Sequence, residues 1–113
     1  LHSGAPPPAL RVVYDLDASA DATVVDVFAP DRVGLLHDIA CALHATGASI
    51  LLARISTEGA RAVDAFYVVD ARTHTPLTQM QRDSVTTALH AAIASVPGSL
   101  PQPMLSWGGD EPR

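Results

Sequence analysis

The pattern of hydrophobic and polar positions predicts four β-strands. The runs rich in β-branched and aromatic residues span 10–16, 23–29, 50–57 and 62–70. Pro30 ends the second run, because proline cannot donate a hydrogen bond to a neighbouring strand. The last two runs are joined by residues 58–61, where Gly59 supplies the unusual φ of a tight turn. These two strands are therefore expected to pair antiparallel.

A period of three to four residues predicts two amphipathic helices. In residues 32–46 it is carried by Leu35, Leu36, Ile39, Ala40 and Leu43. In residues 78–96 it is carried by Val85, Leu89, Ala92, Ile93 and Val96, before Pro97 and Gly98. Asp31 stands where the first helix needs an N-cap, and Gly47 stands where a left-handed residue commonly ends a helix. We expect both residues to bound the first helix.

The predicted order ββαββα indicates an α+β fold. Two helices on one face of a four-stranded antiparallel sheet form a ferredoxin-like two-layer sandwich, here permuted so that the extra strand comes first. The domain is expected to span residues 10–97. Residues 1–9 contain three consecutive prolines and are expected to be a linker, and residues 98–113, with the isolated Trp107, to be an irregular tail.

The last strand has apolar residues on both of its faces. Phe66 and Val68 point to one face, and Val63, Tyr67 and Val69 point to the other. Helices can cover only one face, and an exposed apolar sheet face is typical of a partner surface. The sequence predicts a dimer or a tandem neighbour there, and the alternative is that one of the chain's own tails folds over this face.

The composition and the charge of the chain exclude some classes of binding partner. Of the 113 residues 48% are hydrophobic, the net charge is −5, and the seven basic residues are arginines without a cluster. This composition argues against nucleic acid or an anionic membrane as a partner. A lone Cys41 excludes an internal disulfide and is typical of a reducing compartment, so a cytoplasmic location is expected. Because the chain begins with leucine and a proline-rich segment, we interpret it as a piece of a larger protein whose chemistry happens elsewhere.

The segment 29–36 contains the strongest candidate site. Gly34 inside a helical turn costs about 1 kcal/mol relative to alanine, so a ligand or another backbone is expected to approach there. The free N–H groups of a helix start suit a carboxylate, while Asp31 suits an ammonium group. A free amino acid supplies both charges. The alternative is that Asp31 is only an N-cap and Gly34 only relieves packing.

Neither a metal site nor a catalytic site is predicted. His37, Cys41 and His44 share one stripe of the first helix, a spacing that could hold a soft divalent metal, but no fourth ligand stands nearby in the sequence. The chain has no nucleophile elbow and no phosphate-binding loop. We therefore expect no metal, no cofactor and no catalysis by these residues.

Three segments, DRVGLLHDIACAL, GASILLARISTEG and AVDAFYVVD, resemble the ACT domain family, whose hallmark is an Asp-Arg-Pro-Gly-Leu-Leu turn. The resemblance covers residues 10–96. It is strongest to the ACT domains at the C-terminus of bifunctional uridylyltransferase/uridylyl-removing enzymes, which modify the PII nitrogen-signalling protein. The ligand-binding positions that match are Asp31, Arg32, Gly34, Leu35, Leu36, Ser49 and Ile50. Val33 replaces the usual proline, and Ser49 stands where asparagine is common.

The resemblance implies a regulatory function. ACT domains bind amino acids at interfaces between domains, and this subgroup is implicated in sensing glutamine. The expected partners are an amino acid, a neighbouring ACT domain or second copy, and the catalytic domains of a parent uridylyltransferase, which the domain would control allosterically. The alternative is an ACT-type interaction module that pairs domains without binding a small molecule.

Overall fold

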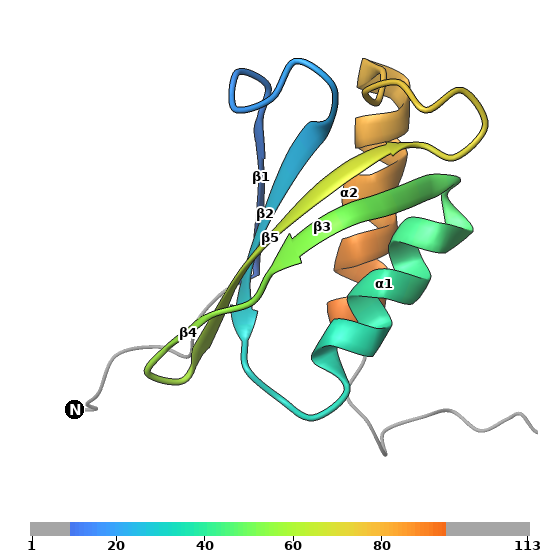
Figure 1. Ribbon diagram of the computed structural model, residues 1–113. Helices are drawn as coiled ribbons and strands as arrows, with labels where there is room; N and C mark the ends of the chain where they lie inside the picture. Colours follow the sequence, from blue (N-terminus) through green and yellow to red (C-terminus); the bar gives the residue numbers. More distant parts are fainter. Residues whose placement is uncertain (1–9, 95–113) are drawn as a thin grey trace, which may run out of the picture.

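The fold is a layer of two helices against one antiparallel sheet, as a computed structural model describes it for residues 10–94 (Figure 1). The expected linker, the expected tail, Val96 and Trp107 lie outside the described residues. In chain order, the elements are β1 Arg11–Asp15, β2 Thr23–Pro30, α1 Leu35–Ala45, β3 Ala48–Arg54, β4 Thr57–Glu58, β5 Arg61–Asp70 and α2 Gln79–Ala94. The predicted ferredoxin-like α+β architecture is confirmed.

The main strands run in the order β1-β2-β5-β3, and all their pairings are antiparallel. The short β4 is a fifth strand that the sequence analysis did not separate from β3, and it pairs with the start of β5. It forms because Gly59, at φ +62°, reverses the chain immediately after Glu58. The first strand, β1, occupies one edge beside β2, and β3 is the other edge.

The start of α1 differs from the prediction. The helix begins at Leu35, and its N-cap is Gly34 at φ +84°, with no side-chain capping bond. The prediction that Asp31 caps this helix is therefore wrong, because Asp31 lies outside the helix and its backbone N–H donates to Ala60 O at 2.9 Å. The C-terminal end of α1 agrees with the prediction, because Gly47 adopts the left-handed conformation, with φ +84°, just beyond the helix.

The core lies between the sheet and the two helices. The fully buried side chains of this layer are Phe66, Val25, Val27 and Val68 from the sheet and Ile39, Leu43, Val85 and Leu89 from the helices. β1 is held to α2 through Tyr14, whose hydroxyl donates to Arg82 O at 2.8 Å and lies 2.9 Å from Thr86 Oγ1. The extra first strand is thus integrated into the domain. Within residues 10–94 no helix is both long enough and apolar enough to cross a bilayer.

The helix-free face of the sheet is less exposed than the sequence suggested. Val69 is only 2% exposed, and Tyr67 is half-buried. Arginine side chains lie over the aromatic rings of this face, Arg11 and Arg61 over Phe28 and Arg54 over Tyr67. Four of the large exposed apolar side chains lie at the β3 edge and beside it, at Leu51, Leu52, Ile55 and Leu36, while Leu16, Val33 and Met80 are exposed elsewhere. Leu52 stands opposite Tyr67 in the register, so it belongs to the helix-free face.

Candidate functional site

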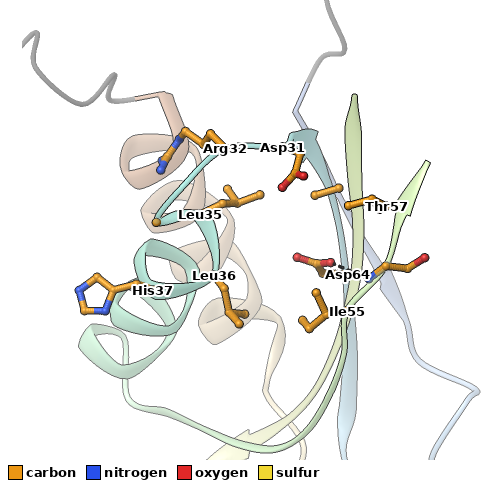
Figure 2. A pocket seen from close by; sticks show the side chains of 11 residues that line it. Asp31, Arg32, Leu35, Leu36, His37, Ile55, Thr57 and Asp64 are labelled. Atoms are coloured by element: carbon orange, nitrogen blue, oxygen red, sulfur yellow. Dashed lines mark hydrogen bonds between the residues drawn. The ribbon is translucent and has the colours of Figure 1, made fainter. Parts of the chain in front are cut away.

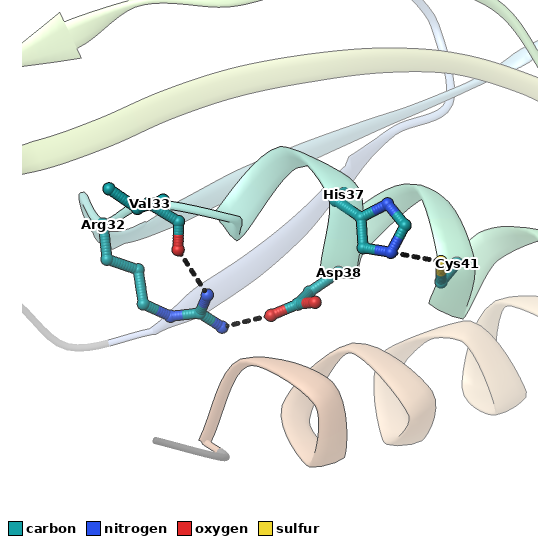
Figure 3. Close-up of polar contacts among 5 residues, drawn as sticks. All are labelled: Arg32, Val33, His37, Asp38 and Cys41. Atoms are coloured by element: carbon teal, nitrogen blue, oxygen red, sulfur yellow. Dashed lines mark hydrogen bonds and ion pairs between the residues drawn. The ribbon is translucent and has the colours of Figure 1, made fainter. Parts of the chain in front are cut away.

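The turn between β2 and α1 is held by its own hydrogen bonds. Leu35 N–H donates to Arg32 O at 3.2 Å, and Asp38 N–H donates to Gly34 O at 2.9 Å. The Arg32 guanidinium reaches forward to Asp38, with Nη2 and Oδ2 2.7 Å apart, and also donates to Val33 O at 3.3 Å (Figure 3). The positive charge of Arg32 is therefore already paired within the turn.

The first amides of α1 remain available. A helix leaves its first N–H groups without partners inside the helix, and Gly34 has no side chain to accept from them. Within the described residues the backbone N–H groups of Leu36 and His37 have no recorded acceptor. Together with the helix dipole, such donors are the kind of group that suits a negatively charged ligand.

A cavity of about 170 Å³ opens between this turn and the sheet (Figure 2). We call it the turn cavity. Its wall is made by the turn, the first turn of α1 and the chain that follows β3, and the lining residues are Asp31, Arg32, Gly34, Leu35, Leu36, His37, Ile55, Ser56, Thr57, Ala62 and Asp64. Its volume lies below the roughly 300–1,000 Å³ of typical ligand pockets.

Asp64 is a lining residue that the sequence analysis missed. It lies on β5 with only 3% of its surface exposed, and its Oδ1 accepts the Ser56 N–H at 3.2 Å. Burial raises its pKa; the Ser56 hydrogen bond opposes this shift, and the nearby Asp31 carboxylate adds to it. The sequence contains a signal for this residue. Asp64 alternates with Phe66 and Val68 and therefore points to the face buried by the helices, where a carboxylate is costly unless it has a partner.

The structure divides the candidate residues between two places. Five of them, Asp31, Arg32, Gly34, Leu35 and Leu36, line the turn cavity. Ser49 and Ile50 do not; they lie at the start of β3, beside the far end of α1, in a separate hollow of about 300 Å³. We call this the Ser49 hollow. The two places share no lining residue, so one copy of the chain does not bring all seven residues together.

The stripe on α1 forms no metal centre within the part of the chain that the structure describes. Cys41 Sγ lies 3.4 Å from His37 Nε2 (Figure 3), and both side chains are exposed. His44 lines the Ser49 hollow instead. Across residues 10–94, no three His, Cys, Asp or Glu side chains are close enough to hold a metal ion together.

Comparison with known proteins shows what the chain as a whole resembles. The sequence profile of the ACT domain matches residues 23–77, from β2 to the loop before α2. The chain is 44% identical over 82 residues to a bifunctional uridylyltransferase/uridylyl-removing enzyme of Phenylobacterium zucineum, covering 73% of this chain and 9% of that protein. It is 42% identical over 90 residues to the enzyme of the same name from Streptomyces coelicolor, covering 80% and 11%.

The chain therefore spans about a tenth of the length of these relatives. Among solved structures, an unknown protein from Galdieria sulphuraria is similar to 66% of this chain, with 28% identity, a TM-score of 0.48 and coverage of 38% of that protein.

Proposed function

This chain belongs to the ACT domain family of regulatory domains, and we propose that it senses a free amino acid, glutamine, in the turn cavity. The observation that carries the proposal is the pairing of opposite charges across one small space. On one side are the unpaired amides at the start of α1, and on the other are the carboxylates of Asp31 and Asp64. An amino acid presents a carboxylate and an ammonium group on the same carbon, so it complements both sides.

The size and position of the cavity favour a site shared between two domains. At about 170 Å³ it is small for a complete amino-acid site, and Ser49 and Ile50 line a separate hollow and do not close it. A second copy supplies the missing wall if the two β3 edges pair antiparallel. The start of one β3 then lies opposite the end of the other, which brings the Ser49 hollow of one copy toward the turn cavity of its partner.

The β3 edge has the character such pairing needs. It is one of the two edges of the described sheet, and Leu51 and Leu52 are 59% and 48% exposed. An edge strand with unpaired backbone groups and apolar side chains is a template for pairing with another chain. Leu36 of α1, 46% exposed, extends this apolar surface beyond the sheet.

The proposed control is a shift between two arrangements of domains. Glutamine held between a turn cavity and a Ser49 hollow binds only when the two edges are paired, so it stabilises the paired state in proportion to its difference in affinity. The relatives are named for two opposing activities, adding and removing uridylyl groups. We propose that pairing biases a parent enzyme of that kind toward one activity.

We expect glutamine to raise the melting temperature of the 113-residue chain by several degrees. A ligand present at about 100 times its Kd stabilises the folded state by roughly 2.7 kcal/mol, which is several degrees for a domain of this size. The measurement is a thermal-shift titration with each common amino acid. A flat response to all of them would remove the sensing proposal and favour a module that only pairs domains.

We expect Leu51→Lys to weaken self-association, because two lysines would face each other across the paired edges. The measurement is molar mass by light scattering against concentration, with and without glutamine. Met80→Lys is the matched control, since Met80 is 78% exposed on α2, away from the β3 edge. Equal masses for wild type and the Leu51 variant at all concentrations would contradict edge pairing.

A further inference from the structure

We propose that Asp64 binds the ammonium group of the amino-acid ligand, while the amides at the start of α1 bind its carboxylate. This inference rests on the proposed function and assigns a ligand contact to a residue outside the hallmark turn. It makes Asp64, on the sheet, the group that distinguishes an amino acid from a simple carboxylic acid.

The placement of Asp64 is the first argument. Its side chain projects from β5 toward the helices, and Figure 2 shows its carboxylate facing the space bounded by Leu35, Leu36 and Ile55. One oxygen accepts the Ser56 N–H, and the structure records no partner for the other among the described residues. A carboxylate that is 97% buried with one oxygen unsatisfied is costly, and a donor entering the cavity would remove that cost.

The charges around the cavity are the second argument. Besides Asp64, the ionisable side chains that line it are Asp31, Arg32 and His37. Arg32 is neutralised by Asp38, so the fixed charge left facing the cavity comes from two carboxylates. Asp31 is exposed and its interactions are screened by water, whereas Asp64 is buried, where a charged hydrogen bond is stronger. An ammonium group is therefore held mainly by Asp64.

The binding is coupled to protonation. Burial raises the pKa of the free Asp64 carboxyl, and a bound ammonium group favours the charged carboxylate and so lowers that pKa again. Glutamine must displace a proton from Asp64 when the pH is below the raised pKa, and its affinity is then expected to fall as the pH falls. The Asp64→Asn substitution removes the part of this pH dependence that comes from Asp64, and any part that comes from Asp31 or His37 remains.

The raised pKa of Asp64 also predicts how the stability of the ligand-free domain changes when the Asp64 charge is removed. A carboxyl whose pKa is higher in the folded state than in the unfolded state stabilises the fold at low pH and loses that contribution as the pH rises through the folded pKa. Asp64→Asn is therefore expected to raise the free energy of unfolding at pH 7. The gain should vanish below the ordinary aspartate pKa of about 3.9.

The test is calorimetric titration of the 113-residue chain with glutamine and with glutaramic acid, which is glutamine without its amino group. We expect Asp64→Asn to weaken glutamine binding about 10- to 100-fold, the effect of losing one charged hydrogen bond, and to leave binding of glutaramic acid unchanged. Asn keeps an acceptor for the Ser56 N–H, so a residue that only holds Ser56 would show no loss. Asp64→Ser is the second variant if Asn prevents folding.

Asp31→Asn is the matched comparison, because it makes the same chemical change in the exposed carboxylate of the same cavity. It is expected to weaken glutamine binding less than Asp64→Asn does. Full glutamine affinity in the Asp64 variant, or a loss found only in the Asp31 variant, would overturn the assignment of Asp64 and leave amino-acid sensing intact. Equal losses for both ligands would overturn it as well, since the role would then be structural. No glutamine binding by the wild-type chain would remove the proposed function and this inference together.

Discussion

Replacing Phe66 with alanine is expected to lower the free energy of unfolding by about 3–5 kcal/mol. Phe66 is fully buried on the helix side of β5, beside Val25 of β2 and Ala53 of β3. Its removal takes the largest apolar group out of the centre of the core and leaves a cavity that the surrounding sheet cannot close. Because small domains are stable by only about 5–15 kcal/mol, much of the protein's stability depends on this ring.

Phe28→Ala is the matched control, because it makes the same substitution on the opposite face of the same sheet. Phe28 is half-buried, with Arg11 and Arg61 5.2 and 5.4 Å from its ring centroid. Partial burial and these cation–π contacts predict a loss of about 1–2 kcal/mol. Urea denaturation with an unchanged m-value measures both variants. An equal loss of unfolding free energy in the Phe66 and Phe28 variants would contradict a core on the helix side of the sheet.

Gly34→Val is expected to lower the free energy of unfolding by at least about 1–2 kcal/mol and to abolish the response to glutamine. Gly34 has φ +84°, a region that costs other residues about this much and branched residues more. A Cβ there would meet only Arg32 Nη1 at 3.8 Å, an ordinary contact, so the effect comes from the backbone. The turn must change its path, which moves the amides of Leu36 and His37.

Gly47→Val separates the loss of stability from the loss of binding. Gly47 has the same φ of +84°, no atom within 4 Å of an added Cβ, and a place outside both the turn cavity and the Ser49 hollow. It should be destabilised by a similar amount while keeping its glutamine response. Thermal shifts with and without glutamine measure both properties. A Gly34 variant that still responds fully to glutamine would show that the turn does not form the site.

Under the proposed function, regulation through a shared site depends on how the chain distributes its polar and apolar groups. The Ser49 hollow lies at the start of β3 and the turn cavity lies beside the chain that follows β3, and Leu51 and Leu52 are exposed on β3 between them. Under the proposed function, ligand binding and edge pairing are then one event. The two variants Leu51→Lys and Asp64→Asn should consequently weaken the glutamine response for different reasons, one by separating the copies and the other by removing a ligand contact.

Local sequence patterns were sufficient for the two helices and the four main strands of this fold, but not for the short β4 or the first residue of α1. The three-to-four residue period of Leu35, Ile39 and Leu43 determines which face of α1 is buried, and the alternation in residues 62–70 determines the faces of β5. Gly47 was identified as the end of α1 because a left-handed residue is cheap only for glycine. These are properties of residues a few positions apart, which is why a single sequence reports them.

Local sequence patterns identify only part of the candidate site. The turn 31–36 is continuous in sequence, so its residues could be grouped without a structure. Asp64 and Ser56 join it only because β5 and the chain after β3 fold against the start of α1, and no local pattern measures that proximity. The N-cap differs from the prediction for a related reason. The backbone of Asp31 pairs with Ala60, a residue far away in the sequence, so the helix starts later, after Gly34.

The sequence by itself determined the two helices, the four main strands and the hairpin pairing of the last two runs, because each depends on short-range periodicity or backbone preference. Only the tertiary structure decided which polar groups meet in the turn cavity, that Ser49 and Ile50 line a separate hollow, and that Leu51, Leu52 and Ile55 are exposed at the β3 edge. The physical reason is that burial and hydrogen-bond pairing are set by contacts between segments far apart in the chain, and these contacts exist only once the sheet and helices have packed.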